Sequence, residues 1–421
     1  MKHQPYYDAC QYLESLGKLD SPLEYMKERK IEDLEKYLLR MQDLLDRIGN
    51  PERGLKYIHI TGTAGKGTTT ALIHNMLQNA GYTVGSTSSP ATTTTLERIR
   101  VGDVYIDPQV FAEIVENLKP IILDMYMNGT YGKPSYFDIM LAIALIYFKQ
   151  QKCDIVILEV GMGGRYDSTN VIPHPFITAI TNISYDHIHL LGDSLKQIAY
   201  EKAGIIKPES IFFTAEQNPE ITNMFQKICT EQGAEYINTP SQENPNHDLA
   251  RAIGARLDID PEEIEKGIIN TQLPCRFEIM QNEPLIILDG AHNLSKIVFS
   301  LEKLKTLEYQ KLYVIFGAGD TKDALAMLDL VVEHTLHITL VPVVSFIGKS
   351  FSLKKMQKHL QEKYPTIIVS VDLDAQNALQ NIRSEIDQND CLLVIGSLYL
   401  AGGLREERYS TEFILEKRKS F

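Results

Sequence analysis

The sequence predicts an α/β fold with two domains, each built on a mainly parallel sheet. Three observations support this prediction. The chain has 421 residues, enough for two or three domains of roughly 150 residues each. Short apolar segments alternate with helical segments in two separate sets, a pattern typical of parallel sheets covered on both faces. A polar stretch that contains proline, residues 239–245, lies before the second set.

In the first set, apolar residues recur at three- and four-residue steps over residues 34–48 and predict a helix, which Gly49-Asn50-Pro51 ends. Residues 57–60 then predict a short buried strand, followed by a glycine-rich turn and a helix from about Thr68 to Asn79. Further strands are expected at residues 155–160, 177–180 and 211–214.

The second set begins at residues 285–288 and continues with apolar segments at 312–316, 338–341, 367–371 and 392–395. We therefore expect a larger N-terminal domain over residues 1–282 and a smaller, Rossmann-like C-terminal domain over residues 283–421. A cleft between two such domains would suit an enzyme that binds two substrates.

Composition excludes several classes of protein. Lys and Arg number 42 against 55 Asp and Glu, so the net charge is −13, which argues against a nonspecific nucleic-acid binder. The longest apolar run has ten residues, Ile139 to Phe148, whereas a membrane helix needs about 20. The N-terminus does not have the pattern of a signal peptide. We expect no membrane partner, a cytoplasmic location and a monomer.

The five cysteines are far apart and form no C-x-x-C pair, which favours neither a zinc site nor a disulfide framework. Reduced cysteines fit the cytosol.

The segment Thr61–Thr69, with the sequence TGTAGKGTT, lies between the first strand and its helix. Its glycines would let backbone N–H groups surround phosphates, and the helix N-terminus would add positive potential. These features predict a P-loop-type ATPase domain, with Lys66 on the β- and γ-phosphates and the Thr68 hydroxyl on Mg²⁺. The spacing differs from the common motif, because Ile60 takes the place of its first glycine and Gly67 separates the lysine from the threonine. The alternative is a glycine turn with a surface lysine.

With this loop the chain resembles the Mur ligase superfamily and, within it, the folylpolyglutamate synthase/dihydrofolate synthase family, whose loop reads T-G-T-N-G-K-G-S. The resemblance covers most of the chain. Further matching motifs, in the family's order, are Ser89-Pro90, Glu97–Arg100, Tyr136–Asp138, Glu159–Arg165, Asp167–Val171, Asp186-His187, Glu201–Ile205, Arg276–Glu278, Asp289–Asn293 and Gly396–Gly402.

The resemblance implies an ATP-dependent ligase of folate biosynthesis and one-carbon metabolism. It would join L-glutamate to the carboxylate of a pteroate or folate through an acyl phosphate, with ATP and Mg²⁺ as cofactors. Catalytic residues would be Lys66, Lys202 and His292. The residues expected to contact ATP are Gly62, Thr63, Gly65, Lys66, Gly67, Thr68, Asn246, Arg276 and Asp289.

The residues alone favour one metal ligand, since Glu159 ends a strand of a parallel sheet near the phosphate loop and hard cations take oxygen donors. A solvated acid at a strand end is the alternative. The resemblance implies a larger set of magnesium ligands, Thr68, Ser89, Glu159, His187 and a carbamylated Lys202. Without it, His187 would be a polar packing residue, and Lys202 would be a surface lysine near a helix end closed by Gly204.

For the acid substrate, the resemblance implies contacts from Ser135, Tyr136, Phe137, Asp138, Tyr166, Asp167 and Ser168. Several identities here depart from the family's pattern. Asp138 replaces a common glutamate, Tyr166 a frequent aliphatic residue and Ala64 the loop asparagine, and Ala91–Thr95 replaces a histidine and leucine. The acid substrate therefore stays open between dihydropteroate, a folate monoglutamate, both, or another acid.

Two other classes of function remain as alternatives. One is a P-loop ATPase or kinase that makes no amide. The other is an inactive nucleotide-binding module, which the presence of Lys66 and Glu159 disfavours.

Overall fold

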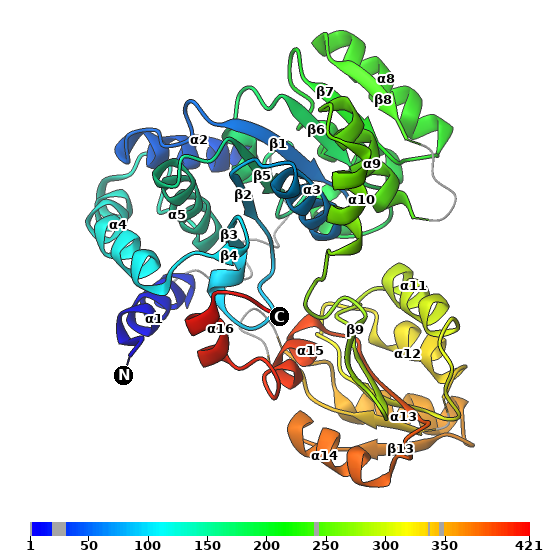
Figure 1. Ribbon diagram of the computed structural model, residues 1–421. Coiled ribbons are helices and arrows are strands. Elements are labelled where there is room, and N and C mark those ends of the chain that lie inside the picture. The colour runs from blue at the N-terminus through cyan, green and yellow to red at the C-terminus, as the bar shows by residue number, and fades with distance from the viewer. Residues whose placement is uncertain (1, 19–30, 240–243, 336, 345–348) are drawn as a thin grey trace. The chain divides into compact units, whose positions relative to one another are not determined.

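The computed structural model describes residues 2–18, 31–239, 244–335, 337–344 and 349–421 (Figure 1). The chain divides into two compact units. The first holds residues up to Ala91, Thr95–Thr271 and Lys417–Lys419, and the second holds Thr92–Thr94, Gln272–Glu416 and Ser420–Phe421. The mixed α/β architecture confirms the predicted fold class.

The first unit is built on an eight-stranded sheet with the order β4-β3-β2-β5-β1-β6-β7-β8. Strands β2, β5, β1, β6, β7 and β8 run parallel, and β3 and β4 extend the sheet antiparallel at one edge. The strands are β1 Lys56–Thr61, β2 Val84–Thr87, β3 Ile99–Val101, β4 Val104–Tyr105, β5 Ile155–Glu159, β6 Ile177–Ile180, β7 Ile211–Thr214 and β8 Glu235–Asn238.

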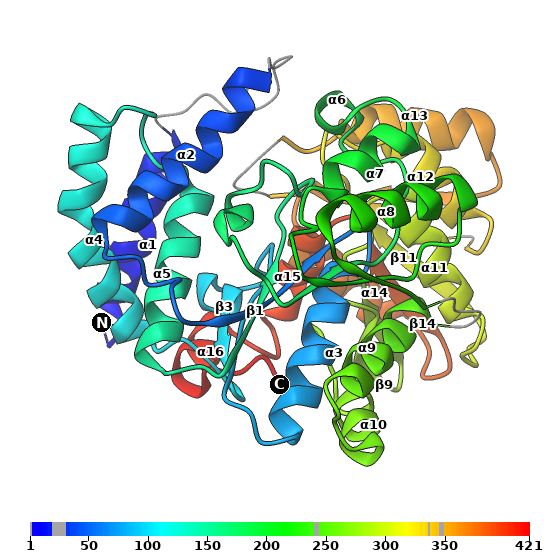
Figure 2. The same cartoon turned by 90° about the horizontal axis from the view of Figure 1, so that it is seen from above.

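Helices cover both faces of this sheet, as its apolar strands require. The helices of the unit are α1 Gln4–Lys18, α2 Ile31–Arg47, α3 Lys66–Asn79, α4 Pro108–Asn128, α5 Tyr136–Gln150, α6 Ile188–Leu191, α7 Leu195–Ala203, α8 Pro219–Gln232, α9 Pro245–Arg256 and α10 Pro261–Ile269, with short 3₁₀ turns η1 Thr95–Arg98 and η2 Ser168–Val171. Helices α3, α9 and α10 share one core with β1, β5 and β6, and they lie side by side in Figures 1 and 2. Helices α7 and α8 pack with Phe212 of β7 in a separate core.

The second unit is built on a six-stranded sheet with the order β13-β12-β11-β14-β10-β9, in which only the edge strand β9 is antiparallel. Its strands are β9 Glu278–Asn282, β10 Leu285–Leu288, β11 Leu312–Phe316, β12 His337–Leu340, β13 Ile368–Val371 and β14 Cys391–Ile395. Helices α11 Leu294–Leu304, α12 Ala324–Val332 and α13 Leu353–Lys363 share one core, and α14 Ala375–Glu385 and α15 Leu398–Arg405 share another. Helix α16 spans Thr411–Lys417.

All nine strands predicted from apolar segments are present, with bounds that differ by no more than one residue at either end. Five strands were missed: β2, β3, β4, β8 and β9. They are short, partly exposed or rich in small and polar residues, so no apolar run marks them. The helix expected from Thr68 begins two residues earlier, at Lys66. Residues 240–243 of the polar stretch lie outside the described part of the chain.

The main segment of the first unit ends at Thr271, upstream of the predicted domain boundary between residues 282 and 283. The difference has a physical cause. Strand β9 pairs antiparallel with β10 through Leu285↔Asn282 and its neighbours, so residues 278–282 belong to the second sheet.

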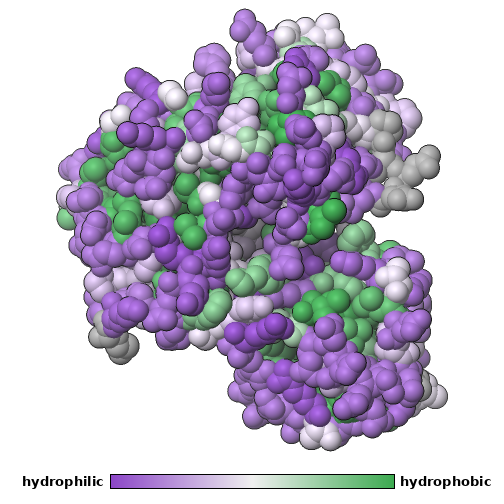
Figure 3. Space-filling model, in the orientation of Figure 1, coloured by the Kyte–Doolittle hydropathy of each residue, from purple (hydrophilic) through white to green (hydrophobic). Residues whose placement is uncertain are grey.

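Within the described part of the chain, no helix combines the length and apolar character needed to cross a membrane. Hydrophilic side chains dominate the face shown in Figure 3. The five cysteines all lie in described segments, and none of them forms a disulfide bond.

Candidate active site

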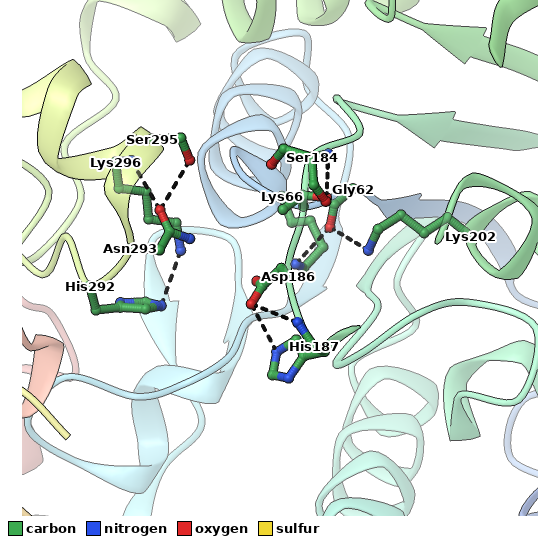
Figure 4. A network of polar contacts seen from close by, with 11 residues as sticks. Gly62, Lys66, Ser184, Asp186, His187, Lys202, His292, Asn293, Ser295 and Lys296 are labelled. Carbon is green, nitrogen blue, oxygen red and sulfur yellow. Dashed lines mark hydrogen bonds and ion pairs between the residues drawn. The ribbon is translucent and has the colours of Figure 1, made fainter. Parts of the chain in front are cut away.

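The glycine-rich loop joins the end of β1 at Thr61 to the start of α3 at Lys66. Gly65 caps the helix in the left-handed conformation, with φ +82°, and no side chain caps the first turn. The first backbone N–H groups of a helix have no partner within it, so this end of α3 presents donors to an anion. Lys66 Nζ donates a hydrogen bond of 3.0 Å to the carbonyl oxygen of Gly62 (Figure 4). The strand–loop–helix geometry is the one that the motif predicted.

The segment after β6 holds this loop in shape. Thr63 exchanges hydrogen bonds with the backbone of Ser184, at 3.0 and 3.1 Å, and its N–H donates to the carbonyl of Asn182. The Ala64 N–H donates to Asn182 Oδ1 at 2.9 Å, and the Thr181 hydroxyl donates to the Ala64 carbonyl at 2.5 Å. Residues 181–184 are therefore structural partners of the loop that sequence reasoning missed.

Two positions of the loop require glycine, because neighbouring side chains lie too close to admit a Cβ atom. A Cβ on Gly62 would lie 1.8 Å from Thr181 Oγ1, and one on Gly65 would lie 2.2 Å from Asn246 Oδ1. The same Asn246 oxygen accepts a hydrogen bond of 3.3 Å from the Thr69 hydroxyl. Asn246 thus contacts the loop, although it lies 181 positions after Gly65.

Glu159 and Ser89 lie together at the carboxyl ends of adjacent strands. The Ser89 N–H donates to Glu159 Oε2 at 2.9 Å, and the Glu159 side chain is buried. Gly67 also faces this carboxylate, since a Cβ there would lie 3.5 Å from Glu159 Oε2. The oxygen donors beside the phosphate loop fit a hard divalent cation.

The contacts of His187 do not include the other predicted metal ligands among the hydrogen bonds and ion pairs described. It has a left-handed backbone, φ +49°, and a largely exposed side chain, and its N–H and ring both face Asp186 Oδ1, at 3.0 and 3.8 Å. Among the described residues no three His, Cys, Asp or Glu side chains form a ready metal cluster. Three of the predicted ligands, the hydroxyls of Thr68 and Ser89 and a modified Lys202, are not of these residue types. His187 as a metal ligand stays a prediction.

Lys202 is buried, so its interpretation as a surface lysine is wrong. Its side chain is 3% exposed, and Nζ donates to the Gly62 carbonyl at 3.0 Å, the same oxygen that Lys66 contacts. Burial lowers the pKa of Lys202 to about 7, and the charge of Lys66 adds to this effect against the opposing charges of Asp186 and Asp167.

Gly204, two residues after Lys202, caps the C-terminal end of α7, as the sequence predicts. Its φ is −60°, so it does not form a left-handed cap. A Cβ at Gly204 would lie 2.4 Å from Arg165 Cα, so close packing excludes a side chain there.

The residues predicted to bind the acid substrate lie at the starts of α5 and η2 and in the residues just before them. Ser135 and Asp138 form a capping box at the start of α5. The fully buried Asp138 carboxylate also accepts a hydrogen bond from the Ser168 hydroxyl and pairs with Arg40 of α2 at 2.7 Å. Arg40 was not identified from the sequence, because nothing in its helical pattern marks it as buried against a charge.

Asp167 is buried and held on both oxygens. Oδ2 accepts from the Met162 N–H at 3.0 Å, and Oδ1 accepts from the Thr169 N–H and hydroxyl. Burial raises the pKa of Asp167. Since the Thr169 hydroxyl donates to Asp167, its oxygen accepts from His59 Nε2, 2.8 Å away in β1.

The remaining predicted residues of this group are aromatic. Phe137 packs against the loop after β5, where a Cβ on Gly161 would lie 3.0 Å from its ring. Arg98 lies over the ring of Tyr136 with 5.5 Å to the centroid. Tyr166 is half-buried, and burial raises its pKa.

In the second unit, Asp289 and His292 follow β10. Asp289 is buried and accepts from the Ala291 N–H at 2.7 Å and the Ser300 hydroxyl at 2.8 Å, and burial raises its pKa. His292 Nδ1 lies 2.8 Å from the Gly290 carbonyl and therefore carries the proton, so Nε2 accepts from Lys296 Nζ at 3.2 Å (Figure 4). Burial lowers the pKa of His292 to about 3, and Lys296 adds to this effect, so the ring is neutral at pH 7.

Arg276 is exposed between two residues with left-handed backbones, Cys275 at φ +53° and Phe277 at φ +52°. Its Nη1 lies 2.9 Å from where a Cβ on Gly290 would be. The buried Glu278 fixes this turn, because its Oε2 accepts from the Cys275 N–H at 2.8 Å and pairs with the fully buried Arg405. Arg276 and Asp289 are thus both near Gly290 within this unit.

Two family models and many known proteins match this chain. The Mur ligase middle domain model matches residues 60–280, and the Mur ligase, glutamate ligase domain model matches residues 275–398. The dihydrofolate synthase/folylpolyglutamate synthase of Bacillus subtilis (strain 168) is 31% identical over 412 residues, which cover 87% of this chain and 94% of that protein.

Two solved structures are also similar. The folylpolyglutamate synthase of Thermotoga maritima is 26% identical, with a TM-score of 0.78, covering 100% of this chain and 99% of its own. A bifunctional folylpolyglutamate synthase/dihydrofolate synthase with Mn, AMPPNP and L-glutamate bound is 25% identical, with a TM-score of 0.76, over 88% of this chain and 93% of its own.

Proposed function

Because the chain belongs to the Mur ligase superfamily and, within it, to the folylpolyglutamate synthase/dihydrofolate synthase family, we propose that it is an ATP-dependent ligase that joins L-glutamate to a pteroate or folate carboxylate. One observation carries the proposal. An open phosphate loop, the buried carboxylate of Glu159 and the buried amine of Lys202 occur together beside β1.

The proposed reaction has two steps. A carboxylate oxygen of the acid attacks the γ-phosphorus of ATP, the bond to the β–γ bridging oxygen breaks, and ADP leaves. The α-amine of glutamate then attacks the acyl carbon of the resulting acyl phosphate and loses a proton, and phosphate leaves as the amide forms. In the first step Lys66 and the loop N–H groups would neutralise the charge that develops on the phosphates.

The divalent cation would be held by Glu159 with the hydroxyls of Thr68 and Ser89, and we propose His187 and Lys202 as further ligands. When bound, Mg²⁺ would supply positive charge to the phosphate oxygens. Glu159 would hold the Ser89 backbone in place through the 2.9 Å hydrogen bond to its N–H.

For Lys202 we propose a carbamate. This modification needs a neutral amine, which bonds to the carbon of CO₂ and loses a proton. A pKa lowered to about 7 makes the neutral amine available near pH 7, whereas an ordinary lysine is almost wholly protonated there. The anionic oxygens would suit a hard cation.

The predicted nucleotide contacts Asn246, Arg276 and Asp289 and the role of His292 remain part of the proposal. A neutral His292 with an engaged Nε2 would orient Lys296 and would not add charge of its own. A monomer and a cytoplasmic location stay predictions as well.

The experiment that tests the proposal measures ADP release with and without glutamate and dihydropteroate or a folate monoglutamate. We expect rapid ADP formation only when both partners are present, and hydroxylamine should trap the acyl phosphate as a hydroxamate. ADP formation at full rate with neither partner would favour an ATPase. If ligation requires another acid, the protein is still a ligase, but its substrate is not a pteroate or folate.

A further inference from the structure

We propose that Arg40 is a positioning residue for the acid substrate, acting through a buried ion pair with Asp138 that fixes the segment Tyr166–Ser168. This inference rests on the proposed function, because it assumes that this segment receives the acid. It also gives Asp138 a different role from the one that the sequence suggested, since the carboxylate would order the site and not contact the substrate.

Asp138 is fully buried in this ion pair, and Arg40 is largely buried. Both Nε and Nη2 of Arg40 lie 2.7 Å from Asp138 Oδ2, and the side chains of Arg40 and Asp138 are 12% and 0% exposed. A charge in such a place needs a partner, because an unpaired buried charge is strongly destabilising. The pair therefore ties α2 to the start of α5.

Four donor groups already face the carboxylate of Asp138, three of them at Oδ2 and one at Oδ1. Oδ2 accepts from Arg40 and from the Ser135 N–H at 2.8 Å, and Oδ1 accepts from the Ser168 hydroxyl. A carboxylate offers about four lone-pair sites, so little capacity remains for a substrate donor. A capping box alone needs only the bond to Ser135, so the bonds to Arg40 and Ser168 serve another purpose.

The bond to Ser168 carries the effect to the proposed acid site. Ser168 begins η2 and directly follows Asp167, whose Oδ2 holds the Met162 N–H in the loop behind Glu159. Phe137, next to Asp138, packs against Gly161 of the same loop. Fixing Asp138 therefore fixes two contacts with the loop that follows the proposed metal ligand.

The same helix offers a matched control. Arg47 of α2 pairs with Asp43 at 2.8 Å and with Asp124, but its side chain is 29% exposed and that of Asp124 is 50% exposed. Exposed pairs contribute little to stability, and Arg47 has no contact with Ser168 or Asp138 among its hydrogen bonds. Arg40→Met and Arg47→Met make the same chemical change on one helix.

The test compares the KM of each of the three substrates in these variants. We expect Arg40→Met to raise the KM for the acid by about tenfold, since small displacements of a binding site have large kinetic effects, and to leave the KM for ATP and glutamate within about twofold. Arg47→Met should behave like the wild type. Arg40→Lys keeps the charge but not the fork of two donors, so it should recover part of the affinity for the acid.

A milder variant covers the case in which Arg40→Met does not fold. Ser168→Ala removes only the bond to Oδ1 and leaves the ion pair, and the acid KM should rise by a few-fold. An unchanged acid KM in a folded Arg40→Met, or in Ser168→Ala where the first variant is insoluble, overturns the inference. So does an equal rise of all three KM values, which would indicate a general loss of structure.

Failure of the proposed function gives a different result. In that case the wild type itself forms no glutamate adduct with a pteroate or folate, and both proposals fall together. If the wild type is active and Arg40→Met raises all three KM values equally, only the positioning role of Arg40 is contradicted.

Discussion

The phosphate loop and the proposed acid site are built by opposite means. Besides the two lysine amines on the Gly62 carbonyl, neutral groups hold the loop: glycines that admit close neighbours, hydroxyls of Thr63 and Thr181, and the amide of Asn182. Buried charges hold the acid site, through Arg40 with Asp138 and through Asp167. The difference is physical. Phosphates bring their own charge and need unpaired donors, whereas a site for a largely neutral ring system must be shaped before the ligand arrives.

Two lysines show the same contrast at closer range. Lys66 and Lys202 both donate to the Gly62 carbonyl at 3.0 Å, but Lys66 is half-buried and Lys202 is almost fully buried. Equal distance to one oxygen therefore does not imply equal chemistry. Substitutions can separate the roles of the two amines and of the loop that they share.

The largest effect is expected from Lys66→Ala. Removing this charge from the phosphates should lower kcat by ~100-fold or more, while the free energy of unfolding changes by less than ~1 kcal/mol. Steady-state kinetics and urea unfolding measure the two quantities. Lys196→Ala, which removes an exposed lysine with a surface ion pair, is the control. Near-normal ligation by a folded Lys66→Ala variant would contradict the assignment of residues 61–69 as a phosphate loop.

Lys202→Ala and Lys202→Arg come next. Both should reduce kcat by about tenfold to 100-fold, because neither side chain forms a carbamate and arginine keeps its positive charge. Acetate should partly restore Lys202→Ala, since a small carboxylate fits the space vacated, and should not restore Lys202→Arg. The rate is measured with and without acetate, and sodium chloride at equal ionic strength is the control. A Lys202→Arg variant with most of the wild-type rate would exclude the metal-organising role.

The pH dependence of stability tests the buried amine without turnover. In the folded state the pKa of Lys202 falls from 10.5 to about 7, so between these values the unfolded chain binds the extra proton. Stability from this group therefore rises with pH from about 7 to about 10 and is lowest below 7. In Lys202→Met we expect the free energy of unfolding not to show this rise with pH. The measurement is urea unfolding at several pH values in CO₂-free buffer. Parallel curves for variant and wild type would contradict the burial of a neutral amine.

The smallest effect concerns a single glycine. Gly65 and Gly81 have nearly the same φ, +82° and +90°, but a Cβ meets Asn246 at Gly65 and nothing within 4 Å at Gly81. Both alanine variants should lose about 1 kcal/mol of stability from the backbone. Only Gly65→Ala should also raise the KM for ATP, by a few-fold, because Asn246 must move. Equal ATP KM values in the two variants would show that Asn246 does not shape the loop.

Much of the fold could be predicted because its signal is local. The strand Ile155–Glu159 is buried at every residue and appears as a continuous apolar run, and Thr61–Thr69 has glycines where the backbone has no room for a side chain. Strands β4, β8 and β9 lack such a run, since each lies at a sheet edge and is partly exposed. Edge strands depend on the neighbour they pair with, which the local sequence does not identify.

The sequence by itself determined the two α/β sheets, the phosphate loop and the family, because these depend on residue patterns within short segments. Only the tertiary structure decided which polar groups are buried and which groups they contact. Lys202 looks like any lysine near a helix end until the chain around Gly62 covers it. Arg40 and Asp138 are 98 positions apart, so their pairing depends on how α2 and α5 pack. Burial and charge pairing are properties of the folded chain, and they set the chemistry proposed for this site.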